Sequence, residues 1–363
     1  MKKKGKKVIF TVQGEGRGHL TQAITLQNIL IEAGYEIGAV LVGTSSARKL
    51  PSFFYEQIKA PVINFSSPNF VIDSKMKSIR IFPSIIFNLK LMPLYFRNMR
   101  MVSRKLKELK PDMVINFYDP LIGMFYMFYN PKIPLICIAH QYSFIHPDFQ
   151  FPEGFFWEKL SLKIFTRLTA SRANRKLALS MYPMRDISNK NLYVIPPLLR
   201  QSVYDTPVTD GNYILIYILN AGYMDEIINW HKDHPDTALH CFTDKKDIDG
   251  EWKYNDNLSF HQINDKKFIE LMATCRAFAT TAGFESICEA MYFGKPVFMV
   301  PVASHFEQYS NARDGAKAGA GIYDSTFNLD KLLAYLPEHK TNPKVFRTWV
   351  SDSKKSLLKH LEE

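Results

Sequence analysis

Residues 280–291 read TTAGFESICEAM, the pattern of a strand end, a glycine turn and the opening of a helix. A strand that feeds directly into a helix is the repeating unit of parallel sheets. The backbone N–H groups at the start of such a helix, together with its dipole, favour an anionic group. This stretch therefore predicts an α/β fold and a diphosphate site that requires no metal ion.

The same alternation extends in both directions along the chain. Further apolar strands are expected at 213–219, 238–242, 258–260, 277–280 and 297–300 in the second half, and at 8–12, 37–42, 113–117 and 135–139 in the first. A helix is expected at 20–33, ended by Gly34. We therefore expect two Rossmann-like, doubly wound α/β domains that face each other across a cleft.

Composition marks the boundaries between these parts. A proline pair ends the first domain at 1–198, and a polar stretch with linker composition follows at 199–211. The second domain is expected at 212–340. Residues 341–363 contain one amphipathic helix, 344–361, expected to return to the N-terminal domain.

Charge and cysteine usage indicate compartment and partner. Residues 1–200 hold 29 Lys and Arg against 12 Asp and Glu, so an anionic partner is expected to meet that half. No uninterrupted apolar run reaches the length of a membrane span, and the basic start lacks the apolar core of a signal peptide. Four scattered cysteines without a C-x-x-C pair are expected to be buried thiols in a reducing cytoplasm.

The stretch at 280–291 continues into a longer pattern. Gly294-Lys295-Pro296 follows its helix, and Glu307-Gln308 and Asn311-Ala312 follow the next strand. Taken singly, Gly283 and Gly294 could be turn glycines, and Glu289 a solvated helix residue. In this order and spacing, they resemble the nucleotide-sugar half of GT-B glycosyltransferases. The most similar is family 28, which includes the peptidoglycan N-acetylglucosaminyltransferase and the monogalactosyldiacylglycerol synthases.

The resemblance implies a donor-binding set in the second domain. The diphosphate would be faced by Gly283, Phe284, Glu285 and Ser286, and the ribose by Glu289. The donor sugar would be contacted by Glu307 and Gln308. A uracil base would be held by His261, Gln262 and Ile263, and the phosphate side would be closed by Asn220 and Gly222. Retaining family 4 enzymes carry a glutamate where this chain has Thr281, so that assignment is disfavoured. The stereochemical outcome stays open.

The N-terminal loop GEGRGH, residues 14–19, is not a dinucleotide site, because His19 stands where the fingerprint requires glycine, and it is not a phosphate-binding P-loop. It resembles the acceptor-side loop of the same glycosyltransferases. The resemblance implies acceptor contacts at Gly16, Arg17, Gly18, His140 and Gln141.

His19 is the expected catalytic base. At a helix N-terminus the dipole disfavours its imidazolium form, so a neutral ring could take a proton from an acceptor hydroxyl. The alternative is a histidine that only caps the helix or positions a phosphate.

Residues 74–107 carry nine Lys or Arg and no acid, interleaved with aliphatic and aromatic residues. Such a segment is typical of an anionic membrane surface. Phe155-Phe156-Trp157, with Lys159, Lys163 and Arg167, is expected to add a second contact. The alternative is that the apolar residues belong to the core and the cations form a solvated face.

Three other signals are discounted. Asp247-Ile248-Asp249 fits a metal-binding D-x-D pattern but lies in a polar turn, and His231 and His234 have no third ligand and are expected on the surface. No RNA-binding aromatic motif accompanies the basic half, so no nucleic-acid partner is expected.

The expected function is transfer of a hexose or N-acetylhexosamine from a nucleotide-sugar, with UDP as the expected nucleotide, to a membrane-associated lipid. Ceramide, diacylglycerol and polyprenol-linked saccharides all stay open as acceptors. No cofactor or metal is expected, and the location is cytoplasmic, peripheral on the inner face of the membrane. The alternatives are a nucleotide-sugar 2-epimerase and a non-catalytic sugar-nucleotide or membrane-binding protein.

Overall fold

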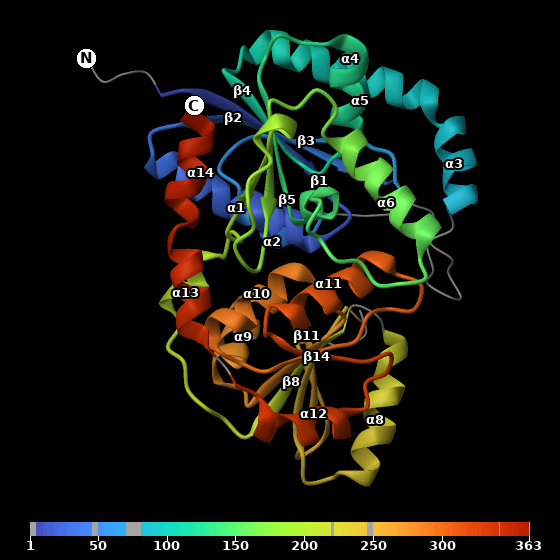
Figure 1. Ribbon diagram of the computed structural model, residues 1–363, viewed down its shortest axis with the longest axis vertical. Coiled ribbons are helices and arrows are strands. Elements are labelled where there is room, and N and C mark those ends of the chain that lie inside the picture. The colour runs from blue at the N-terminus through green and yellow to red at the C-terminus, as the bar shows by residue number, and fades with distance from the viewer. Residues whose placement is uncertain are drawn as a thin grey trace. The chain divides into compact units, whose positions relative to one another are not determined.

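The computed structural model describes residues 5–45, 50–69, 81–218, 221–244, 250–340 and 342–362 (Figure 1). They form two compact α/β units. Unit 1 holds the described residues up to Phe149, Glu153–Arg200 and the chain from Trp349 onward, and unit 2 holds Gln150–Pro152 and Gln201–Thr348.

Unit 1 is built on a seven-stranded parallel sheet in the order β3-β2-β1-β4-β5-β6-β7. Its strands are β1 (Lys7–Gln13), β2 (Glu36–Thr44), β3 (Val62–Ser66), β4 (Met113–Phe117), β5 (Leu135–Ala139), β6 (Arg175–Leu179) and β7 (Leu192–Ile195). Every residue of β4 and β5 is buried, as in a parallel sheet covered by helices on both faces. The strand order reverses between β1 and β4, so the loops after these two strands flank the switch point at which doubly wound sheets bind ligands.

Helices surround this sheet (Figure 1). They are α1 (Arg17–Glu32), α2 (Ser52–Gln57), α3 (Ile81–Lys90), α4 (Met92–Leu109), α5 (Pro120–Tyr129), η1 (His140–Ile145), α6 (Phe156–Thr169), η2 (Ser188–Lys190) and α14 (Ser353–Glu362). Helix α1 ends at Glu32, and Gly34 follows with a left-handed φ of 86°, which confirms the expected stop.

Unit 2 contains a second seven-stranded sheet, in the order β10-β11-β9-β8-β12-β13-β14. Its strands are β8 (Tyr213–Ile218), β9 (Ala238–Thr243), β10 (Glu251–Asn255), β11 (Leu258–Gln262), β12 (Ala277–Thr280), β13 (Val297–Met299) and β14 (Gly321–Tyr323). All pairs are parallel except β10 with β11. Here the order reverses between β8 and β12. Two Rossmann-like α/β units confirm the expected fold class.

The helices of unit 2 connect these strands. They are α7 (Gln201–Asp205), η3 (Ala221–Tyr223), α8 (Met224–Asp233), α9 (Asp265–Thr274), α10 (Phe284–Phe293), α11 (Phe306–Lys317), α12 (Leu329–Tyr335) and η4 (Leu336–Glu338); α13 (Pro343–Ser351) runs from this unit into unit 1. Lys295, only 3% exposed, anchors the polar segment before β8, because its ammonium donates to Thr209 O at 2.6 Å and to Asp210 Oδ1 at 3.0 Å.

The polar stretch at 199–211 contains the short helix α7, in which Val203 is fully buried. Two local expectations are wrong. The single helix expected at 344–361 is two helices, α13 and α14, which separate at Asp352. His231 is not a surface residue: it is 1% exposed and hydrogen-bonds Asn255 of β10.

All four cysteines are buried free thiols, as expected. Among the described helices, none combines the length and hydropathy that crossing a bilayer requires.

Candidate active site

Most of the predicted site residues lie in loops at the carboxyl ends of strands or in the first turn of the helix that follows, whereas His261 and Gln262 lie in β11 and Glu289 lies further along α10. In three of these loops a residue other than glycine has left-handed backbone angles: Tyr118 (φ 63°) after β4, Ala282 (φ 59°) after β12 and Ser304 (φ 61°) before α11. Such a conformation costs roughly 1 kcal/mol or more for a residue with a Cβ, and it recurs at functional sites. The strain therefore coincides with the two switch points and with the loop after β13.

In unit 1 the structure brings His19, Gln22, Tyr118 and Gln141 together; we call these four residues the His19 cluster. Gln22 Oε1 accepts from His19 Nδ1 at 3.3 Å, and Gln141 Nε2 donates to His19 Nε2 at 3.4 Å. The Tyr118 ring stacks on the imidazole with centroids 5.6 Å apart. Because the Gln22 oxygen can only accept, the proton lies on Nδ1 and the lone pair on Nε2. The ring is therefore oriented as a neutral base.

Burial keeps this imidazole neutral. His19 is 7% exposed, and its burial lowers its pKa to about 4, while the Gln22 hydrogen bond acts weakly in the opposite direction. Burial is thus the main cause of the low pKa of this ring, a cause that the sequence analysis did not name.

The sequence analysis did not identify Gln22, Tyr118 or Asp119. Asp119 is fully buried at the start of α5, where its Oδ1 accepts from Ile122 N at 3.2 Å. Burial raises the pKa of its carboxyl to about 7, and hydrogen bonds from backbone N–H groups oppose that rise. The signal was present in the sequence: an aspartate before a proline, directly after a buried strand, is a helix N-cap.

Gly43 of β2 provides the space that Asp119 occupies. A Cβ at Gly43 would lie 1.9 Å from Asp119 Oδ2 and 2.6 Å from the Cβ of Ser67. Gly43→Ala is therefore expected to destabilise unit 1 by about 1–3 kcal/mol through overpacking, measured as a lower thermal midpoint. Gly38→Ala, on the same strand, is the matched control, because its Cβ would meet the flexible Lys7 side chain at 3.3 Å and Val8 O at an ordinary contact distance of 3.8 Å. Equal midpoints for the two variants would contradict this packing.

The other predicted acceptor residues take separate positions in unit 1. Gly16 is the N-cap of α1, and a Cβ added there would have no atom within 4 Å. The guanidinium of Arg17 lies 5.4 Å from the centre of the Phe53 ring. Gly18 is half-buried next to His19. His140 is buried, and its Nδ1 donates to Leu179 O at 3.1 Å, so its ring belongs to the interior.

In unit 2 the predicted phosphate-facing residues lie at the N-terminus of α10. Gly283 is its N-cap, provides no side-chain cap and is exposed, and an added Cβ would meet nothing nearer than Ser286 Oγ at 3.5 Å. The left-handed residue of the turn is Ala282, so neither backbone conformation nor packing requires glycine at 283. The first N–H groups of a helix lack helical acceptors. Phe284 and Ser286 are buried and Glu285 is half-buried.

A second loop, before α11, is tied to the first. Gln308 Oε1 accepts from Val302 N at 2.8 Å, and Asn311 Nδ2 donates to Ala282 O at 3.1 Å. The Asn311 bond joins α11 to the strained turn before α10. We call residues 281–283 and 300–305 the unit 2 loop pair. Glu307 is half-buried in the first turn of α11.

Two alternatives from the sequence can now be judged. Glu289 is 2% exposed within α10, so it is not a solvated helix residue. Gly294 has a φ of 75° and caps α10 in the left-handed conformation, so it is indeed a turn glycine.

The predicted base-binding residues do not share one environment. His261 is 1% exposed, its Nε2 lies 3.0 Å from His240 Nδ1, and burial lowers its pKa to about 4. Gln262 is exposed, and its N–H donates to Gly250 O at 2.9 Å. Ile263 is half-buried and Gly222 is exposed, whereas Asn220 lies outside the described residues, as does the motif at 247–249.

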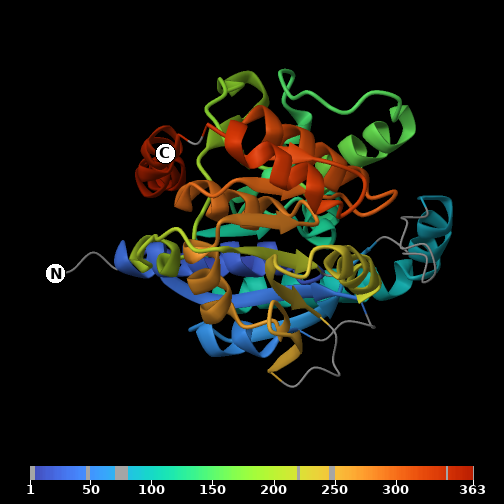
Figure 2. The same cartoon turned by 90° about the horizontal axis from the view of Figure 1, so that it is seen from below.

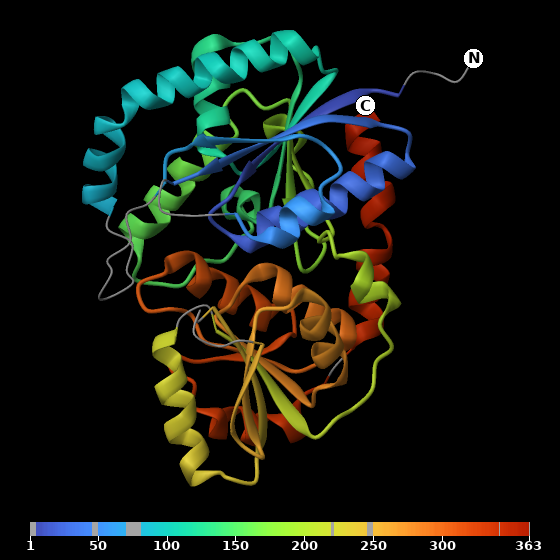
Figure 3. The same cartoon turned by 180° about the vertical axis from the view of Figure 1, so that it is seen from behind.

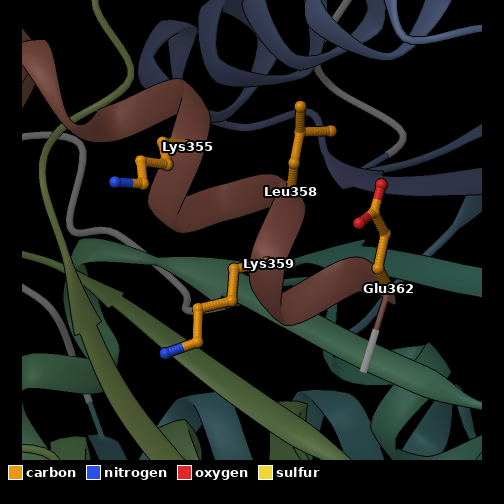
Figure 4. A pocket seen from close by; sticks show the side chains of 4 residues that line it. All are labelled: Lys355, Leu358, Lys359 and Glu362. Atoms are coloured by element: carbon orange, nitrogen blue, oxygen red, sulfur yellow. The ribbon is translucent and has the colours of Figure 1, made fainter.

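A surface hollow of about 530 Å³ is found on α14 and is separate from these clusters. It is lined by Lys355, Leu358, Lys359 and Glu362 (Figure 4). None of these residues was predicted to bind a ligand. Within the described ranges, no group of three or more His, Cys, Asp or Glu side chains has an arrangement that could hold a metal ion.

Comparisons with known proteins identify a family for this chain. Residues 6–338 match the family described as glycosyl transferase family 1. An uncharacterized glycosyltransferase of Methanosarcina mazei is 22% identical over 346 residues, covering 87% of this chain and 85% of that protein.

Solved structures share the fold along nearly the whole chain. Phytolacca americana UGT2, complexed with UDP-2-fluoro-glucose and pterostilbene, aligns with a TM-score of 0.63 at 11% identity, covering 96% of this chain and 95% of that one. Acinetobacter baumannii MurG aligns with a TM-score of 0.57 at 16% identity, covering 98% and 99%.

Proposed function

The chain belongs to glycosyl transferase family 1 and is a glycosyltransferase of the GT-B fold, and we propose that its donor is a UDP-sugar bound at the unit 2 loop pair. The observation that carries this proposal is Gly283. It is an exposed N-cap glycine that neither packing nor backbone conformation requires. Close approach of a diphosphate to the helix N-terminus supplies a reason for it. We also propose that, among GT-B glycosyltransferases, this chain is most similar to family 28.

The proposed chemistry needs a base and a site for the departing charge. The oxygen of an acceptor hydroxyl forms a bond to the anomeric carbon as its proton moves to His19 Nε2, and the bond from that carbon to the diphosphate oxygen breaks. The departing UDP takes the electron pair, and the N–H groups opening α10 stabilise its charge. We propose that no metal ion takes part. Glu289 would accept from the ribose, and Glu307 and Gln308 would contact the sugar.

We further propose that the acceptor is a lipid at an anionic membrane surface. The excess of 29 basic over 12 acidic residues in the first 200 supports an anionic partner for unit 1. The four buried free thiols fit a reducing compartment, so the proposed location is the cytoplasmic face of the membrane.

The test is incubation of the full chain with a panel of radiolabelled UDP-sugars and a total lipid extract, followed by separation of the products. Label in an extractable glycolipid supports the proposal. A free or altered sugar formed without lipid would indicate hydrolysis or 2-epimerisation. Binding of UDP without turnover would indicate a non-catalytic sugar-nucleotide protein. Either of these results would overturn the lipid acceptor.

The pH profile of transfer is expected to follow the buried base. Because the pKa of His19 is about 4, this side chain stays in its base form on acidification. Protonation of His19 should therefore lower kcat/KM by no more than half down to about pH 5. An exposed imidazole would be half protonated near pH 6.5. A limb near pH 7 that disappears in Asp119→Asn would belong to Asp119, whose pKa is about 7. A limb near pH 6.5 that persists in Asp119→Asn would contradict a buried His19 base.

A further inference from the structure

Helix α6 of unit 1 presents apolar side chains to solvent. Phe156 is 67% exposed, Trp157 70% and Ile164 57%, and Leu160 of the same helix is 38% exposed. Phe156, Trp157 and Ile164 are among the most exposed large apolar residues in the described part of the chain. Contiguous exposed apolar patches on a folded protein mark binding surfaces.

This outward stripe is additional to the apolar side chains that α6 turns inward, where Phe165 and Leu168 pack against the core of unit 1. At about 100° per residue, the four apolar side chains span about 100° of the helix circumference. Their centre lies roughly opposite Thr166 and Thr169, which are fully buried. A surface helix of a soluble domain normally turns its apolar stripe toward the core. Here a second apolar stripe lies on the outer face.

A basic stripe runs beside the apolar one. Lys159, Lys163 and Arg167 follow one another at four-residue spacing and so lie on one side of the helix. Burial, and then the proximity of Lys159 and Arg167, lower the pKa of Lys163, so the three cations are close enough to repel one another. Glu158, the acid of this helix, is half-buried on the inner side. This combination is complementary to an anionic lipid surface.

The inner face of α6 contacts the His19 cluster. The Tyr118 hydroxyl and Thr166 Oγ1 are 2.8 Å apart, and the Tyr118 and Phe165 rings meet edge to face at 5.7 Å. Tyr118 also stacks on His19. One helix therefore carries the outward apolar stripe and supports the proposed base.

Helix α3 adds exposed apolar surface. Ile86, Phe87 and Leu89 are 46%, 47% and 62% exposed, and Lys90 follows them. Figures 1, 2 and 3 each show α3 and α6 on the same side of unit 1. The preceding part of the predicted membrane segment, residues 74–80, and the side chains of Ile81, Phe82 and Ile85 lie outside the described residues.

We propose that α6 docks unit 1 on an anionic bilayer, with its aromatic stripe in the headgroup region and Lys159, Lys163 and Arg167 on the lipid phosphates. The inference rests on the proposed lipid acceptor and names the element that meets the membrane. A lipid hydroxyl at the bilayer surface then lies next to the helix that supports Tyr118 and His19.

The experiment is sedimentation of the full chain with vesicles of phosphatidylcholine, with and without phosphatidylglycerol, at low and high salt. The wild type should bind the anionic vesicles and lose binding at high salt. Phe156→Ser with Trp157→Ser should weaken binding roughly 100-fold, about tenfold per aromatic side chain. Lys159→Gln with Lys163→Gln should weaken it roughly 25-fold, about fivefold per cation. Tyr323→Ser with Val345→Ser removes comparably exposed apolar residues of unit 2 and should leave binding unchanged.

Trp157 provides an independent readout in the same samples. Its fluorescence should shift to the blue on anionic vesicles, and Trp157→Phe should abolish the shift while keeping most of the binding. Absence of binding at low salt, or binding that the α6 variants do not weaken, would overturn the docking surface. So would self-association of the wild type that Phe156→Ser with Trp157→Ser abolishes, because the stripe would then bind a second copy. These assays contain no donor sugar, so their failure is distinguishable from failure to form a glycolipid.

Discussion

Replacing His19 with alanine is expected to lower the kcat of sugar transfer by about 10²–10⁴-fold, the usual contribution of a positioned general base. The acceptor hydroxyl would lose the group that takes its proton. The donor should bind unchanged, because the donor contacts proposed here are all residues of unit 2. The measurement is transfer kinetics beside donor binding in the same preparation.

The matched control for His19→Ala is His231→Ala. His231 is also a buried, hydrogen-bonded histidine, but it lies in unit 2 beside Asn255. Its loss should lower the thermal midpoint and leave kcat within a few-fold of the wild type. A His19→Ala enzyme with a kcat within fivefold of the wild type would remove His19 from the mechanism. It would then favour the alternative that His19 only positions a phosphate, because its ring makes no capping bond to α1.

Replacing Gly283 with valine is expected to raise the KM for the UDP-sugar by about 100-fold or more without changing the fold. An added Cβ meets no protein atom nearer than 3.5 Å, and the φ of −74° suits any residue. The valine would instead occupy the space through which a diphosphate reaches the first N–H groups of α10. Loss of two charge-assisted hydrogen bonds, at roughly 1.5 kcal/mol each, corresponds to such a factor.

Gly16→Val is the matched control for Gly283→Val. Gly16 is also a helix N-cap with extended backbone angles, and an added Cβ there would have no neighbour within 4 Å. Because Gly16 is a predicted acceptor residue, its replacement should affect the KM for the acceptor and not that for the donor. Equal effects of both variants on the donor KM would contradict the assignment of the diphosphate to α10.

The fold could be predicted because its central strands are short runs buried on both faces. The strands that were not expected, β3, β6, β7, β10 and β14, lie toward the edges of the two sheets. The bounds expected for β4, β5 and β12 are those of the structure, since hydrophobic periodicity is the strongest signal that a sequence carries. β10 was missed because all five of its residues are exposed at a sheet edge. The break between α13 and α14 was missed because the amphipathic pattern continues through Asp352.

The candidate site could be predicted only where its residues are consecutive. The loop at 14–19 and the helix opening at 283 are local patterns that the chain displays directly. The His19 cluster is not a local sequence pattern, because Tyr118 and Gln141 are about a hundred residues away from His19 along the chain. Burial likewise depends on tertiary neighbours. For this reason the sequence analysis did not foresee that burial lowers the pKa of His19, and it wrongly placed His231 on the surface.

The most direct test of the central claim is calorimetric titration of the wild type and Gly283→Val with UDP, in the presence of EDTA. The account predicts that UDP binds the wild type without a divalent cation, that CDP and GDP bind more weakly, and that Gly283→Val weakens UDP binding by about 100-fold at an unchanged thermal midpoint. Absence of UDP binding in EDTA, or equal binding by the wild type and Gly283→Val, would contradict a metal-independent UDP-sugar site at the N-terminus of α10.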